Sequence, residues 1–99
     1  MFRHVVMFRW TADATAESKA RVAAELAKLP EAIDTIRHYS FGPDAGVSDG
    51  NWDFGVVADF ADGDGYIAYR DHEAHQALIA QWIRPIVAER AAMQLTLPD

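Results

Sequence analysis

The chain has 99 residues, 51% hydrophobic and 24% charged, a composition typical of one small folded domain rather than of a disordered segment. The formal net charge of −6 offers no basic field to a phosphate backbone, so we expect no nucleic-acid partner. The absence of cysteine excludes disulfides, thiolate metal sites and a cysteine nucleophile. We expect residues 1–99 to form a single domain, too short for separate catalytic and cofactor domains.

The first predicted element is a strand over residues 2–10. Its even positions are apolar apart from His4, whereas its odd positions include Arg3 and Arg9, so the faces alternate with the period of a strand. Because these three polar residues interrupt the apolar run, it cannot serve as a secretion signal or a membrane span. We therefore expect a cytoplasmic protein with no membrane partner.

A helix is predicted next, from Thr15 as its N-cap to Leu29. Val22, Leu26 and Leu29 recur at the spacing of a buried helical face. Pro30 is expected to close this helix, because proline has no amide hydrogen for the helical ladder.

The second half of the chain predicts two strands over residues 35–42 and 52–60, then a helical stretch over 65–85, then a strand over 90–97. A bend near His72 is expected to divide the helical stretch in two. The order β-α-β-β-α-α-β predicts an α+β fold, a ferredoxin-like split βαβ subunit with helices on one face of an antiparallel sheet.

The pattern also assigns side chains to the two faces of this sheet. Apolar residues expected to pack under the helices are Phe2, Val6, Phe8, Trp10, Trp52, Phe54, Val56 and Phe60. The opposite face is expected to carry Val5, Met7, Val57, Tyr39, Phe41, Met93, Leu95 and Leu97. This is more apolar surface than a monomer exposes, so we expect a symmetric homodimer in which a second sheet covers it.

Motifs along nearly the whole chain resemble the stress-responsive alpha/beta-barrel family, also called Dabb. They are the opening Phe2-Arg-His4-Val-Val-Met-Phe8, the turn Phe41-Gly42-Pro43, the strand start Trp52-Asp53-Phe54 and the stretch Tyr69-Arg-Asp-His72-Glu-Ala-His75. Glu73 stands where the family usually has proline. The resemblance implies a dimeric α+β barrel, and one branch of the family comprises plant polyketide cyclases such as olivetolic acid cyclase.

The resemblance places His4, Tyr69 and His75 at the positions that line the cyclase pocket. His75 is suited to take a proton from an activated methylene, and Tyr69 to donate to the carbonyl oxygen that becomes an enolate. Phe54, His72 and Trp82 are candidate substrate-binding residues. The expected ligand is a small hydrophobic or polyketide-like molecule, and no cofactor is expected.

Other interpretations of these residues stay open. A lone histidine on an apolar strand face, such as His4, is more often a core residue. His72 and His75 have a spacing found in metal sites, but no further ligand is fixed by spacing, so we expect no metal. The chain could also be a non-catalytic stress-associated small-ligand binder, or a cofactor-free oxygenase or isomerase of the wider dimeric barrel superfamily.

Overall fold

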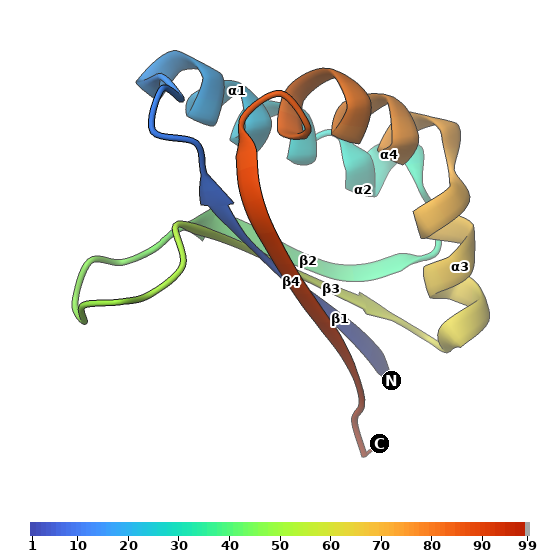
Figure 1. Cartoon of the computed structure of the whole chain (residues 1–99). Helices are drawn as coiled ribbons and strands as arrows, with labels where there is room; N and C mark the ends of the chain where they lie inside the picture. Colours follow the sequence, from blue (N-terminus) through green and yellow to red (C-terminus); the bar gives the residue numbers. More distant parts are fainter. Residues whose placement is uncertain (99) are drawn as a thin grey trace.

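A four-stranded antiparallel sheet forms one layer of the protein, and helices cover one of its faces (Figure 1). We describe residues 1–98 of a computed structural model. The strands are β1 (Phe2–Trp10), β2 (Ile36–Pro43), β3 (Phe54–Phe60) and β4 (Val87–Thr96), in the spatial order β2-β3-β1-β4. The two chain-terminal strands, β1 and β4, are neighbours. This is the α+β ferredoxin-like arrangement expected from the sequence.

The helical layer consists of α1 (Ala16–Leu26), α2 (Leu29–Ala32), α3 (Gly63–Asp71), α4 (Glu73–Leu78) and the π-helical turn η1 (Ile79–Ile83). Thr15 caps α1 as predicted, accepting a hydrogen bond from the backbone amide of Ser18 at 3.0 Å. The predicted end of that helix is wrong. The first helix ends at Leu26, and Pro30 lies in the first turn of α2, where its missing amide hydrogen has no helical partner to lose.

The predicted bend between the last helices is confirmed at His72. Its backbone is extended, with φ −63° and ψ 138°, so α3 ends and α4 begins there. The His72 Nδ1 accepts a hydrogen bond from the backbone amide of Ala74 at 3.0 Å and thereby caps α4. The side chain of His72 therefore stabilises the break between α3 and α4, next to Glu73.

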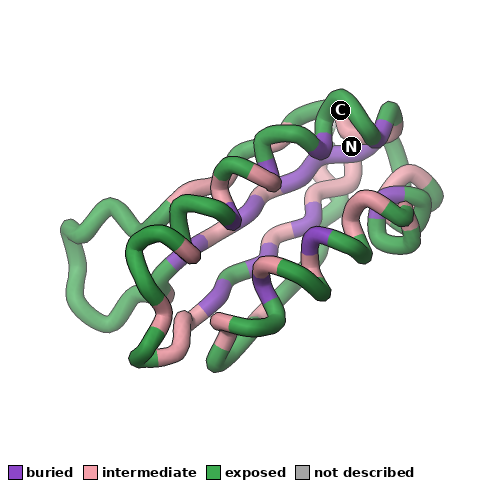
Figure 2. Tube along the Cα trace, turned by 90° about the horizontal axis from the view of Figure 1, so that it is seen from above, coloured by how far each residue is buried: buried purple, intermediate pink, exposed green. Residues whose placement is uncertain are grey.

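The core lies between the helices and one face of the sheet. Figure 2 shows that buried segments follow the strands and the inward sides of the helices, whereas residues 44–51, between β2 and β3, are exposed throughout. Phe60 and Val22 are completely buried at its centre. Of the residues expected on the outer face, Met7, Met93 and Leu95 are exposed there, at 36%, 55% and 40% of their surface.

Three aromatic residues lie on the face opposite to the one predicted. Tyr39 and Phe41 pack against the core under the helices. Ile36 does so as well, because a bulge between Ile36 and His38 adds a residue and reverses the alternation along β2. Trp52 precedes β3 and packs beneath the guanidinium of Arg9, 4.4 Å from the ring centre, instead of joining the core.

No helix within residues 1–98 is long and apolar enough to cross a membrane.

The outer face of the sheet carries an ion pair whose carboxylate is buried and whose guanidinium is partly exposed. Arg3 donates two hydrogen bonds to the Asp59 carboxylate, at 2.7 and 2.9 Å, and Asp59 is only 4% exposed.

Candidate functional site

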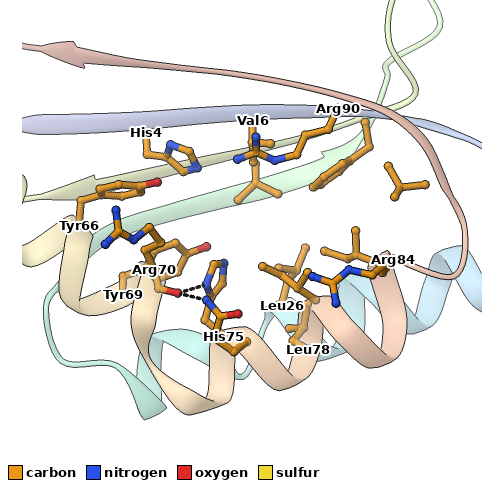
Figure 3. Close-up of a pocket in the computed structure, with 16 residues that line it drawn as sticks. His4, Val6, Leu26, Tyr66, Tyr69, Arg70, His75, Leu78, Arg84 and Arg90 are labelled. Atoms are coloured by element: carbon orange, nitrogen blue, oxygen red, sulfur yellow. Dashed lines mark hydrogen bonds between the residues drawn. The ribbon is translucent and has the colours of Figure 1, made fainter.

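A cavity of about 390 Å³ lies between the sheet and the helical layer. Its walls combine apolar side chains with several polar ones (Figure 3). The lining residues are His4, Val6, Phe8, Leu26, Val56, Tyr66, Tyr69, Arg70, His75, Gln76, Leu78, Ile79, Ile83, Arg84, Val87 and Arg90. This volume is at the lower end of the range for small-molecule sites.

His4 enters the cavity from β1 and is 4% exposed. Gln94, directly opposite on β4, donates a hydrogen bond from Nε2 to the His4 Nδ1 at 2.8 Å. Burial, followed by the nearby charges of Arg90 and His75, lowers the pKa of His4 to about 4. His4 is therefore neutral near pH 7, and with Nδ1 accepting, its Nε2 carries the proton and is a donor.

His75 enters the same cavity from α4, on the opposite side (Figure 3). Its Nδ1 lies 3.0 Å from the backbone oxygen of Arg70, at the end of α3. A carbonyl only accepts, so Nδ1 carries the hydrogen and Nε2 is left with a free lone pair. Burial is the main cause that lowers the pKa of His75, against the raising effect of this hydrogen bond.

Tyr69 lies beside His75, with ring centres 4.2 Å apart, and is 2% exposed. Its hydroxyl is 2.9 Å from the hydroxyl of Tyr39 on β2. Burial raises the pKa of Tyr69 to about 12, while the hydrogen bond from Tyr39 acts to lower it. When Tyr39 donates in this pair, the proton of Tyr69 is free for a second acceptor.

The π-helical turn η1 shapes the wall next to His75. The backbone amide of Arg84 donates to the oxygen of Ile79, five residues earlier, at 2.8 Å. This wider turn begins and ends with Ile79 and Ile83, both of which line the cavity. Such turns are frequent at functional sites because they shift side chains relative to a regular helix.

The sequence predictions for the site differ in outcome. His4, Tyr69 and His75 line one cavity, so the structure brings these three together. Phe54, His72 and Trp82 are not among its lining residues. Phe54 is a core residue, His72 caps α4, and the Trp82 ring lies under the guanidinium of Arg21 at 4.1 Å.

Sequence reasoning missed Tyr66 and the arginines of the cavity. The Tyr66 ring packs on His4, with ring centres 4.7 Å apart. Its spacing of three residues from Tyr69 on one helix was a usable signal. Arg70, Arg84 and Arg90 gave none, because they come from three separate elements that only the tertiary fold brings to one cavity.

No cluster of three or more histidine, aspartate or glutamate side chains within residues 1–98 is arranged to hold a metal ion. The cavity instead offers the Nε2 of His4 as a hydrogen-bond donor, the Nε2 of His75 as an acceptor and the phenol of Tyr69. These are the groups of acid–base chemistry.

Similar solved structures share the fold over almost the entire chain. A dimeric ferredoxin-like protein of unknown function from Thermobifida fusca YX is 44% identical, with a TM-score of 0.90, over 97% of this chain and 90% of that one. A Dabb family protein from Mesorhizobium loti MAFF303099 is 23% identical, with a TM-score of 0.82, over 99% of this chain and 97% of that one.

A dimeric protein of unknown function and ferredoxin-like fold from Bacteroides fragilis is 23% identical, with a TM-score of 0.80, over 97% of this chain and 95% of that one. A search of curated proteins gave no match. The sequence model of the stress responsive A/B barrel domain family, Dabb, matches residues 2–96. Together with the ferredoxin-like sheet, this match over nearly the full length shows that the chain belongs to the Dabb family.

Proposed function

We propose that this protein is a cofactor-free acid–base enzyme that catalyses an intramolecular aldol cyclisation of a small poly-β-carbonyl compound. One observation carries the proposal. The two imidazoles in the cavity have opposite hydrogen-bonding roles, since Gln94 leaves the Nε2 of His4 as a donor and the Arg70 carbonyl leaves the Nε2 of His75 as an acceptor. A base and a donor thus line one cavity.

In the first step, the His75 Nε2 takes a proton from a methylene between two carbonyl groups. The C–H electron pair becomes the enolate, whose oxygen accepts hydrogen bonds from Tyr69 and His4. The enolate carbon then bonds to a second carbonyl carbon of the same molecule. The resulting alkoxide takes the proton back from His75, so the base is regenerated and no oxidant or reductant is consumed.

The surroundings suit this chemistry. Val6, Leu26, Val56 and Leu78 line the cavity with apolar surface, which strengthens hydrogen bonds to a developing oxyanion by excluding water. Because burial lowers the pKa of His75, its neutral form, the one able to accept a proton, prevails near pH 7. A positioned base of this kind contributes about 10²–10⁴-fold in rate.

The proposal is tested with linear 3,5,7-trioxooctanoic acid and its N-acetylcysteamine thioester, by following the carbocyclic product against the spontaneous lactone. The protein should accelerate ring closure of at least one probe, and His75→Ala should reduce the rate by about 10²–10⁴-fold. Added imidazole should restore part of the lost rate, because it fits the space that the side chain leaves.

His38→Ala is the matched control. The side chain of His38 is 71% exposed and lies outside the cavity, so its removal should leave the rate unchanged. Ring closure no faster than in buffer, or equal rates for the parent protein and His75→Ala, would reject the enzyme and favour a small-ligand-binding protein with the same cavity.

We also infer that two copies of this chain associate through the outer face of the sheet. Met7, Met93 and Leu95 expose apolar surface there, and solved structures of similar fold are described as dimeric. A second sheet over these side chains would complete the α+β barrel, with each cavity on the far side of its own sheet.

A further inference from the structure

Two arginines of the cavity have no ion-pair or hydrogen-bond partner for their guanidinium groups within residues 1–98. The other five arginines in the sequence all have one: Arg3 with Asp59, Arg9 with Glu89, Arg21 with Glu25, Arg37 with the Asp34 carbonyl and Arg70 with Asp71. The exceptions are Arg84 and Arg90, and both line the cavity. The chain has a net charge of −6, but the two guanidinium groups without a partner give this cavity a local positive charge.

Of these two arginines, Arg90 is the one whose charge acts on the acid–base residues His4 and His75. It lies on β4 opposite Phe8, which directs its side chain to the helix-covered face of the sheet. Figure 3 shows this side chain running along the sheet towards His4, while Arg84 projects from the end of the helical layer. After burial, the charge of Arg90 also contributes to the lowered pKa values of both His4 and His75, so it lies within electrostatic reach of both rings.

We propose that the cavity selects a substrate that carries a free carboxylate, held by the guanidinium groups of Arg90 and Arg84. This inference rests on the proposed function, whose substrate it narrows from poly-β-carbonyl compounds in general to oxo acids rather than their neutral thioesters or amides. The planar guanidinium fork matches a carboxylate, and the apolar walls next to it accommodate the carbon chain.

The position of Arg90 favours a carboxylate on the substrate itself over a phosphate on a carrier group. An anion bound at Arg90 would lie within electrostatic reach of His4 and His75, so we expect it to be only a few bonds from the reacting carbon. Bound there, it would also offset the repulsion between Arg90 and the imidazolium that forms when His75 takes a proton. Carboxylate binding and proton abstraction would thus support each other.

Binding is measured by calorimetry with matched probes, 4-phenylbutyrate and its neutral amide, and with 3-phenylpropyl phosphate as a phosphate monoester. The acid should bind about ten-fold or more tightly than the amide, and this preference should weaken as salt is added. Arg90→Gln should remove most of the preference by weakening the acid alone. Arg84→Gln should reduce it by a smaller factor, because Arg84 lies farther from His4 (Figure 3).

Arg37→Gln is the matched control, since Arg37 is exposed, bonded to the Asp34 carbonyl and outside the cavity, and should keep the preference. His75→Ala should also keep it, so carboxylate selection can hold even where cyclisation fails. Equal binding of acid and amide, undetectable binding of the acid at millimolar concentration, tighter binding of the phosphate monoester, or an unchanged preference in Arg90→Gln would each overturn the inference.

Discussion

The two faces of the sheet treat buried polar side chains in opposite ways, although Arg3 and His4, one on each face, are neighbours on β1. On the helix-covered face, His4 is buried, and its pKa is lowered to about 4, so it is kept neutral. On the outer face, Asp59 is equally buried but charged, because the hydrogen bonds from Arg3 lower the pKa of its carboxyl. The covered face is therefore suited to proton exchange with a ligand, and the outer face holds fixed charges.

The apolar residues show the same division. The helices bury the large side chains of the covered face, such as Phe8, Phe54 and Phe60. The outer face leaves Met7, Met93 and Leu95 partly in water around the Arg3 and Asp59 pair. The apolar side chains of the covered face are thus buried within one chain. We infer that those of the outer face are buried only when a second chain covers them.

A charge in the centre of the outer face should have the largest effect on this division. In the proposed dimer, Met7→Asp would bury an unpaired carboxylate, and we expect the dimer dissociation constant to rise by about a hundred-fold or more. Light scattering across a dilution series measures this. Ile67→Asp is the matched control, since Ile67 is 45% exposed but lies on α3, away from the outer face. A Met7→Asp protein that dissociates like its parent would contradict the proposed interface.

Lowering the pH should distinguish the two faces, because protonation of His4 and of Asp59 lowers the unfolding free energy in different pH ranges. The pKa of His4 falls from its ordinary 6.5 to about 4 on folding, so the unfolded chain binds a proton more readily. Above pH 6.5, His4 is neutral in both the folded and the unfolded chain. As the pH falls from 6.5 towards 4, the unfolded chain takes up the proton first, so the folded state loses about 3 kcal/mol of stability in total. Folding lowers the pKa of the Asp59 carboxyl as well, but its range of pH lies below that of His4. Its contribution is present above its ordinary pKa of 3.8 and is lost only below it.

Urea unfolding at fixed protein concentration, repeated between pH 7 and 3, checks this order. His4→Gln should flatten the slope of the unfolding free energy between pH 6.5 and 4, and Asp59→Asn should flatten only the part below pH 4. A slope between pH 6.5 and 4 that persists unchanged in His4→Gln would show that the His4 ring is hydrated in the folded protein.

Local sequence rules were sufficient for the order of the four strands along the chain and for the break at His72, since alternation and capping residues act within a few positions. They failed at Pro30, which begins α2 instead of closing the first helix. They failed again where one residue changed the period of a strand. The bulge after Ile36 turned Tyr39 and Phe41 to the helices, and with them the hydroxyl that bonds Tyr69. No pattern in the sequence announces that bulge.

The site shows the same limit. His4, Tyr69 and His75 came from the family resemblance and do share one cavity. Trp82 was selected by residue type alone, and it packs instead with Arg21 across two helices. The free guanidinium groups of Arg84 and Arg90 depend on which carboxylates lie near them in space, and that information is absent from spacing along the chain.

The smallest expected effect concerns the joint between α3 and α4. The hydrogen bond that fixes the tautomer of His75 crosses this joint, because its acceptor, the Arg70 carbonyl, belongs to α3 and His75 to α4. His72→Ala removes the cap on α4 and should lower the unfolding free energy by about 1 kcal/mol. It should also admit the other tautomer of His75, seen as a change in its ¹⁵N ring shifts, and lower kcat more than it raises KM.

His72→Asn is the matched variant, because asparagine is a strong N-cap whose side-chain oxygen can accept the bond from the Ala74 amide. It should restore both the stability and the ring shifts. Loss of stability in His72→Ala with unchanged His75 shifts would mean that α4 keeps its place without the cap, and that the break supports the fold but does not set the base. The acid–base groups of the covered face come from β1, α3 and α4. Because the hydrogen bond of His75 joins α3 to α4, its tautomer is the most sensitive measure of whether these elements keep their relative positions.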